Sequence, residues 1–365
     1  MELTPEDEKI YASAVKARDA DALANLGVAY LRRMKVAEAL ACTEAALAIK
    51  PDFPAAQFNR EQLLGHRKFF GEVRATLEEY ARRTGLDPSA IESREIEFPA
   101  AFVNANGDPR FALSLPGSLI LSDLGAALLF QHEVAGRGWE FPLRNFLDAQ
   151  LRSDDVFIDV GAHFGIHSLT AATTRLSNQV SVLAIEAHPE NAERLQGWVA
   201  RNRLQDAVEV MSTAVGDQEG FAQLRVNASS MGHSLEGYPG NAGSPEMAIG
   251  VTTVDNIMAV RPSLQWRRVI VKIDVEGHEY HVLTGARRLF ATGDVAAVIW
   301  ENGSHNEQRV LGERRKATLA FLNSFGFAHY RFDGENGRLT PLPTLDVACD
   351  VYSLSPDLRA DLIGR

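Results

Sequence analysis

Val156-Phe-Ile-Asp-Val-Gly-Ala-His-Phe-Gly165 is the stretch that decides the fold of this chain. Residues 156–160 read as a buried strand, Gly161 and Gly165 mark a turn, and helical text follows. A second apolar run over 180–185 leads to Glu186. A strand, a glycine turn, a helix and a second strand ending in a carboxylate form the arrangement by which α/β proteins hold an adenosine nucleoside. The stretch therefore predicts a ligand that contains adenosine.

The spacing of the glycines separates two classes of such ligands. A dinucleotide turn needs G-x-G-x-x-G, but Ala162 and His163 follow Gly161, and the next glycine is Gly165. Without the second glycine a pyrophosphate cannot approach the backbone closely, so an NAD-dependent dehydrogenase is disfavoured. A tight turn with no cofactor, as in any α/β fold, stays open at this point.

Composition narrows the range of partners. The chain has 365 residues, is 45% hydrophobic and carries a net charge of 37 − 48 = −11, which suits two domains with buried cores. A negative field does not gather nucleic acid or an anionic membrane surface, and no stretch reaches the length of a membrane span. Residues 1–8 are acidic and no apolar run follows, so we expect no secretory signal and a cytoplasmic protein. Cys42 and Cys349 match no metal or redox spacing.

Residues 1–87 read as an all-α domain with one tetratricopeptide-like unit that starts at Ala20. The positions that fit this 34-residue pattern are Leu23, Leu26, Gly27, Tyr30, Ala39, Ala46 and Pro51. A second, degenerate unit is expected over 54–88. Such helices bury little surface alone, so the segment predicts either a docking groove for a partner or an element for self-association.

Residues 88–150 read as a connecting segment with a strand pair near 111–121 and short helices. From 151 to 365, apolar runs alternate with helical text, which predicts an α/β domain with a parallel sheet covered on both faces. The expected strands are 156–160, 180–185, 208–214, 269–274 and 295–300, followed by a hairpin of 328–332 with 347–354. A site in such a domain lies at the carboxyl ends of the strands.

Further motifs follow the glycine turn in a fixed order. They are Ala214-Val-Gly-Asp217, Thr252-Thr-Val-Asp255, Val271-Lys-Ile-Asp-Val-Glu-Gly277, Val282-Leu-Thr-Gly-Ala286 and Val298-Ile-Trp-Glu301. In this order, and together with the D-x-G-x-x-x-G turn, they resemble the FkbM family of methyltransferases. The resemblance implies a class I methyltransferase with a Rossmann-like sheet that uses S-adenosylmethionine. It also implies a small-molecule or glycan acceptor, methylated on a hydroxyl of a sugar, polyketide or other secondary metabolite. His163 and His278 depart from the family pattern, which often has Asn and Ala there.

The cofactor set implied by this resemblance is Asp159, Gly161, Ala162, His163, Gly165, Glu186, Ala187, Ala214, Val215 and Asp274. Within it, Glu186 is expected to accept hydrogen bonds from both ribose hydroxyls, because a carboxylate offers two oxygens to two neighbouring donors.

Asp274, Glu276, His278 and Glu301 are the catalytic candidates. Asp274 and Glu276 lie two residues apart at a strand end and start on the same side. They have three interpretations: a base for the acceptor proton, a divalent metal site together with Glu301, or, for Glu276, a cap on the following helix. His278 is the first candidate among the histidines for the base, before His281 and His305.

Other features stay open at the level of sequence. His163 and His167 have zinc-chelating spacing, but no third ligand is evident nearby. Trp139-Glu140 is expected to form a wall of the site or simply to pack in the core, and residues 227–250 are read as a substrate lid or a plain loop. N-methylation of an amine or amide, and a silent scaffold, remain the alternatives to O-methylation.

Overall fold

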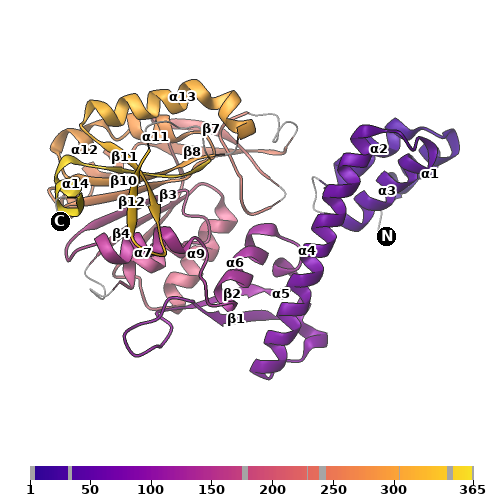
Figure 1. Ribbon diagram of the computed structural model, residues 1–365, viewed down its shortest axis with the longest axis horizontal. Coiled ribbons are helices and arrows are strands. Elements are labelled where there is room, and N and C mark those ends of the chain that lie inside the picture. Colours follow the sequence, from indigo (N-terminus) through magenta and orange to yellow (C-terminus); the bar gives the residue numbers. More distant parts are fainter. Residues whose placement is uncertain are drawn as a thin grey trace. The chain divides into compact units, whose positions relative to one another are not determined.

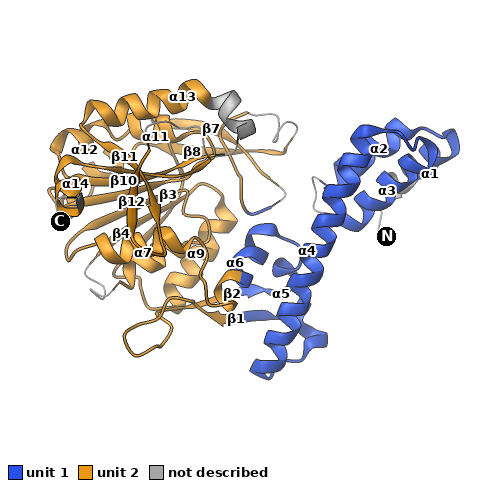
Figure 2. Ribbon diagram, viewed as in Figure 1, with its two compact units in different colours: residues 1–97, 114–131, 228–230 blue, residues 98–113, 132–227, 231–365 orange. Residues whose placement is uncertain are grey.

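The computed structural model describes residues 5–31, 35–174, 180–227, 229–237, 244–303, 305–342 and 348–363. It divides into two compact units (Figure 2). Unit 1 comprises Met1–Glu97, Ser114–Gln131 and Ala228–Ser230, and unit 2 comprises Phe98–Leu113, His132–Asn227 and Met231–Arg365. The segment 88–150, expected as a connection, is shared between the two units, and the predicted domain boundaries stay predictions.

Unit 1 begins with four helices, α1 (Pro5–Ala17), α2 (Ala20–Leu31), α3 (Val36–Ile49) and α4 (Pro54–Thr84). The repeat pattern that starts at Ala20 predicts helices, and the structure has α2 and α3 there. Gly27 lies where they touch, because a Cβ there would stand 2.8 Å from Thr43 Oγ1 and 3.1 Å from the Ala39 carbonyl oxygen. The segment expected as a degenerate second unit contains one helix of 31 residues, α4, which begins at Pro54 and is followed by the left-handed Gly85. The tetratricopeptide assignment itself stays a prediction.

The strand pair expected at 111–121 is also wrong. The pair consists of β1 (Glu95–Pro99) and β2 (Ala112–Pro116), and residues 117–120 form the short helix α5 (Gly117–Ile120). The helix α6 (Leu124–Val134) follows. Pairing over this distance along the chain depends on tertiary contacts, which a local pattern does not record.

Unit 2 is built on an eight-stranded sheet in the order β12-β11-β13-β10-β9-β3-β4-β5 (Figure 1). The strands are β3 (Val156–Val160), β4 (Ser181–Glu186), β5 (Val208–Ser212), β9 (Val269–Ile273), β10 (Val295–Asn302), β11 (Ala328–Asp333), β12 (Arg338–Pro341) and β13 (Cys349–Leu354). From β5 to β10 all neighbours are parallel, whereas β13 runs antiparallel to β10 and β11. The predicted fold class, an α/β domain with a Rossmann-like, largely parallel sheet preceded by helices, is confirmed.

Helices cover both faces of this sheet. Figure 1 shows α11 (Glu279–Thr284), α12 (Arg287–Thr292) and α13 (His305–Ser324) on one face, and α7 (Phe141–Gln150) and α9 (Pro189–Arg201) on the other. The remaining helices of this unit are α8 (Ile166–Ala172), α10 (Val254–Ala259) and α14 (Pro356–Ile363). The central strands β3 and β9 are buried at every position, which explains their continuous apolar runs.

Three strands that the sequence did not predict form a separate sheet. Its order is β6-β8-β7, with β6 (Ala214–Val215), β7 (Gly220–Arg225) and β8 (Glu246–Thr252). The run expected as one strand over 208–214 therefore ends at Ser212, and residues 246–250 of the expected lid belong to β8. Residues 228 and 238–243 of that lid lie outside the described residues. No helix of the described chain has the length and apolar character of a membrane span.

Candidate active site

The site lies where the strand order reverses. The chain runs outward from β3 to β4 and β5 and then returns to β9 on the other side of β3, so the switch point falls between β3 and β9. There the N–H of Asp274 donates to the Val160 carbonyl at 3.0 Å. Gly161 has φ +77°, and a Cβ on it would stand 1.8 Å from the Asp274 carbonyl oxygen. Only glycine allows the two strand ends to approach this closely.

The rest of the turn is fixed by backbone contacts. The N–H groups of Gly161 and Ala162 donate to the carbonyl of Ile185 at 2.9 and 3.0 Å, which ties the turn to the end of β4. Gly165 has φ +87°, and a Cβ there would lie 1.9 Å from Leu195 Cδ1. At both glycines of the D-x-G-x-x-x-G pattern a side chain would clash with its neighbours, which explains why glycine is needed there. The turn lies at the carboxyl ends of the strands.

Glu186 ends β4 as predicted, and its carboxylate already accepts backbone hydrogen bonds. The N–H of His163 donates to Oε2 at 2.8 Å and the N–H of His188 donates to Oε1 at 2.9 Å, and the Asn191 side chain is a third donor. Burial raises the pKa of this carboxyl despite these bonds. Because a carboxylate has about four acceptor positions, about one remains for a ribose hydroxyl without rearrangement.

Lys272 is the residue whose role sequence analysis missed. Its Nζ lies 3.0 Å from the Gly161 carbonyl oxygen, 3.2 Å from Asp274 Oδ2 and 3.7 Å from Asp159 Oδ1. Burial opposes its charge, but Asp274 and Asp159 outweigh burial and raise the pKa of Lys272 above its usual value. The one available signal was a cation inside the apolar run Val269–Ile273 of a buried strand.

Asp159 supports the turn from beneath. It is fully buried, and its Oδ2 accepts a hydrogen bond from Ser168 Oγ at 2.6 Å. With no exposed surface, it acts in this structure by fixing the first turn of α8 and compensating Lys272. It was expected among the cofactor ligands, and the structure gives it a positioning contact.

Glu140 joins the same charged group from the start of α7. Its Oε2 lies 2.6 Å from His167 Nε2. Burial opposes ionisation of Glu140, but the hydrogen bond to His167 and the charge of Lys272 lower its pKa to about 2. Trp139, expected to form a wall beside it, packs edge to face on His132 with ring centroids 5.3 Å apart.

His163 and His167 do not form a chelating pair on one helix. His163 belongs to the turn, where it has φ +53° and stacks on Phe164, and α8 begins only at Ile166. Burial and the charge of Lys272 lower the pKa of His163 to about 3, so its ring is neutral near pH 7. His167 is bonded to Glu140, the first residue before α7.

The three carboxylates that are catalytic candidates lie together at the ends of β9 and β10. Asp274, Glu276 and Glu301 each offer an oxygen within 4.8 Å of the others. Burial, followed by the charges of Asp274 and Glu276, raises the pKa of Glu301 to about 10. Asp350, which sequence analysis missed, pairs with Glu301 across β10 and β13, and burial and the charge of Glu140 raise its pKa to about 7.

Glu279 takes the turn contacts that were considered for Glu276. It is buried, and its Oε1 accepts the N–H groups of Gly277 at 3.0 Å and Val275 at 3.4 Å. Burial raises its pKa to about 7. Glu276 lies in the same turn and has φ +53°, a backbone conformation that residues other than glycine rarely adopt. The turn thereby directs Glu276 toward Asp274 and Glu301.

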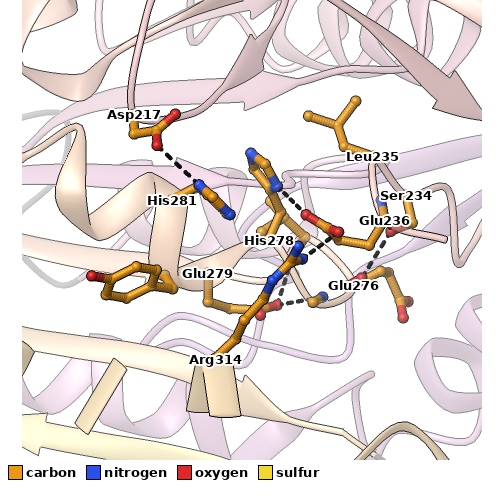
Figure 3. A network of polar contacts seen from close by, with 12 residues as sticks. Asp217, Ser234, Leu235, Glu236, Glu276, His278, Glu279, His281 and Arg314 are labelled. Carbon is orange, nitrogen blue, oxygen red and sulfur yellow. Dashed lines mark hydrogen bonds and ion pairs between the residues drawn. The ribbon is translucent and has the colours of Figure 1, made fainter. Parts of the chain in front are cut away.

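His278, the first candidate base, belongs to a neighbouring cluster (Figure 3). Its Nδ1 lies 2.6 Å from Glu236 Oε1, and its ring stacks on that of His281 with centroids 4.5 Å apart. His281 Nδ1 lies 3.1 Å from Asp217 Oδ2, and the guanidinium of Arg314 pairs with Glu236. Sequence analysis gave both histidines as candidate bases but missed Glu236. The side chain of His305 lies outside the described residues.

A comparison with protein families finds one similarity in this part of the chain. Residues 159–329 match the methyltransferase FkbM domain. The matched segment contains the glycine turn, Glu186, Lys272 and the carboxylates of β9 and β10. No curated protein matches the sequence.

Several solved structures resemble the chain at low identity. Methyltransferase FkbM from Methylobacillus flagellatus KT is 17% identical with a TM-score of 0.37, and the alignment covers 64% of this chain and 54% of that chain. An O-methyltransferase from Bacillus cereus in complex with SAH is 9% identical, with a TM-score of 0.32 and coverage of 58% and 80%. A SAM-dependent O-methyltransferase from Thermotoga maritima is 13% identical, with a TM-score of 0.29 and coverage of 58% and 64%. The chain thus spans about half the length of the first of these proteins.

Proposed function

We propose that this chain is an S-adenosylmethionine-dependent methyltransferase that methylates a hydroxyl of a sugar, a polyketide or another secondary metabolite. One observation carries the proposal: the turn from Gly161 to Gly165 opens at the switch point beside Glu186, inside the segment that matches the methyltransferase FkbM domain. A turn of this spacing takes an adenosine ligand that has no pyrophosphate.

The residues at the turn fit this cofactor in their donor chemistry. Glu186 retains about one acceptor position for a ribose hydroxyl, and Thr213 N–H donates to the Glu186 carbonyl, which brings Ala214 and Val215 to the same strand ends. The backbone of Ala162, His163, Gly165 and Ala187 would line the turn, with Asp159 and Lys272 fixing it from beneath. S-adenosylmethionine supplies an electrophilic methyl group on a sulfonium when it is bound.

Glu276 is the base that we favour for the acceptor proton. Asp274 is paired with Lys272 at 3.2 Å, and Glu301, with a pKa of about 10, keeps its own proton near pH 7. As an acceptor oxygen attacks the methyl carbon, its proton needs a nearby carboxylate, and Glu276 lies within the same group. His278 remains the second candidate for this role.

The carboxylate group also supports two alternatives. Three oxygens from Asp274, Glu276 and Glu301 within 4.8 Å suit a hard divalent cation, which would orient the hydroxyl and lower its pKa. An amine acceptor could enter as an ammonium ion and relieve the repulsion that raises the pKa of Glu301. Its nitrogen would have to give a proton to a carboxylate such as Glu276 before it takes the methyl group, and the result would be N-methylation.

The helices of unit 1 extend the proposal to a partner. Their tetratricopeptide-like packing around Gly27 supports a docking surface for another protein or for a second copy of the chain. A scaffold without turnover stays the competing proposal, and the first experiment separates it from the enzyme.

Calorimetric titration of the protein with S-adenosylhomocysteine and with NAD tests the cofactor assignment. We expect binding of S-adenosylhomocysteine alone. Glu186→Ala should weaken it about 30-fold or more, because at least one charged hydrogen bond to the ribose and two backbone anchors of the turn are lost. Glu193→Ala, an exposed glutamate on α9, is the matched control and should bind normally.

Thermal unfolding of both variants separates lost binding from lost fold. Full affinity in a folded Glu186→Ala protein would overturn the ribose assignment. Binding of neither ligand to the native chain would favour the scaffold and direct attention to unit 1.

A further inference from the structure

A second cluster of ligand-type side chains lies beside the proposed catalytic carboxylates. Glu236, His278 and His281 each offer a ligand atom within 4.8 Å of the others. The two histidines come from the first turn of α11, and Glu236 comes from the segment after β7 (Figure 3). Two imidazoles and one carboxylate are a donor set typical of zinc.

The orientation of His281 is that of a metal ligand. Its Nδ1 is bonded to Asp217 Oδ2 at 3.1 Å, so Nε2 is left for another partner. Figure 3 shows the ring edge opposite Asp217 turned toward His278 and Glu236. A carboxylate that accepts one ring N–H fixes the tautomer and raises the basicity of the other nitrogen, as is common beside metal-bound histidines.

His278 and Glu236 supply the other two donors. Their ligand atoms, Nδ1 and Oε1, lie 2.6 Å apart and share a proton. Both side chains are mostly buried, with 14% and 13% of their surface exposed, whereas His281 and Asp217 are more open at 27% and 47%. The cluster therefore has a shielded side and an accessible side, which gives an ion a path of entry and a fourth position for water.

We propose that Glu236 Oε1, His278 Nδ1 and His281 Nε2 bind a zinc ion, with Asp217 as the carboxylate that orients His281. Zinc takes His278 Nδ1 in place of the proton that bonds to Glu236, and the neutral ring keeps that proton by moving it to Nε2. Donor atoms around tetrahedral zinc stand about 3.3 Å apart, so the donors move from their present spacing by side-chain rotation.

Arg314 is the feature that weighs against a cation here, and its position is compatible with the site. The guanidinium pairs with Glu236 Oε2 and leaves Oε1 on the side of the histidines. Burial opposes ionisation of Glu236, but His278 and Arg314 lower its pKa to about 2, which keeps the carboxylate ready to bind.

Zinc at this position would join two segments close to Glu276. Glu236 follows Ser234, whose Oγ donates to the Glu276 carbonyl at 2.8 Å, and His278 follows Glu276 in the same turn. The ion would fasten the residues after β7 to this turn, which makes its role one of positioning. The inference does not depend on methyl transfer and holds for a scaffold as well.

Calorimetric titration of tag-free, metal-depleted protein with zinc chloride tests the site, and absorption of the cobalt-substituted protein reports its geometry. We expect one zinc per chain and visible bands of a tetrahedral cobalt complex. His281→Ala should weaken binding more than about 100-fold, and Asp217→Asn about 10-fold.

Two control variants locate the ion. His66→Ala removes a half-buried histidine on α4, outside the cluster, and should leave the affinity unchanged. Glu301→Gln alters the neighbouring carboxylate group and should leave zinc binding unchanged as well. Binding that Glu301→Gln abolishes, binding that survives in folded His281→Ala, or no binding to the native chain would each overturn the proposal.

Discussion

Two groups of carboxylates at the same edge of one sheet behave in opposite ways. Around Lys272, Asp159 and Glu140 lie close to a buried ammonium ion, and the pKa of Glu140 falls to about 2. One strand farther, around Glu301 and Asp350, acidic side chains face one another, and the pKa of Glu301 rises to about 10. Asp274 belongs to both groups, because it pairs with Lys272 and lies beside Glu301.

The difference between the two groups shows how one buried cation, Lys272, sets the charge of the carboxylates around it. A buried carboxylate beside a cation stays charged and fixes the backbone around it, as Asp159 does beneath the turn. Carboxylates that lie close to one another repel each other's charge, so at least one of them keeps a proton. A bound cation would stabilise such a group. We therefore interpret the Lys272 side as the rigid support of the cofactor turn, and the Glu301 side as the place where chemistry occurs.

The largest test of this comparison removes its cation. Lys272→Met should lower the free energy of unfolding by about 3–5 kcal/mol, because Asp159 is left buried without its compensating charge. Urea unfolding measures this loss. Lys316→Met, at an exposed lysine on α13, is the control and should change stability by less than about 0.5 kcal/mol. A loss below about 1 kcal/mol for Lys272→Met would contradict the assigned role.

A smaller effect on stability is expected from Glu301, and its size depends on pH. With a folded pKa of about 10, Glu301 keeps its proton while the unfolded chain releases it above about pH 4.5, so stability from this group is full below that pH and falls as pH rises toward 10. Glu301→Gln removes this titration. From pH 6 to pH 8 the variant should gain about 2 kcal/mol relative to the native chain, measured by urea unfolding.

Parallel pH curves for the native chain and Glu301→Gln would show that Glu301 is not crowded in this way. Repeating the series with millimolar magnesium sharpens the result. If Asp274, Glu276 and Glu301 hold the ion, magnesium should stabilise the native chain at pH 8 and leave Glu301→Gln unaffected.

The smallest effect concerns the support of Asp159. Ser168→Ala removes the hydrogen bond from Oγ to Asp159 Oδ2 and should cost about 1.5 kcal/mol, at the low end for a bond to a charged group, because Lys272 still compensates the carboxylate. Thermal unfolding detects this loss. Ser324→Ala, where the hydroxyl bonds only to a backbone carbonyl near the end of α13, gives the comparison and should cost less.

Several elements could be read from local sequence because their physics is local. The strands β3, β4, β9 and β10 are buried on both faces and appear as continuous apolar runs, and Gly161 and Gly165 mark positions where a side chain does not fit. Errors arose where partners are distant, as at β1 with β2 and at β7 with β8. Their amphipathic or short segments carry no record of which strand they pair with.

The candidate site divides in the same way. By itself, the sequence determined the glycine turn, Glu186 at the end of the next strand, and the carboxylates of the Lys-Ile-Asp-Val-Glu-Gly string, because each belongs to a motif with fixed spacing. Only the tertiary structure decided that Lys272 joins the ends of β3 and β9, that Asp350 lies opposite Glu301 and that Glu236 meets His278. Charges act through space, so residues far apart in the chain set each other's protonation, and spacing along the sequence does not encode that distance.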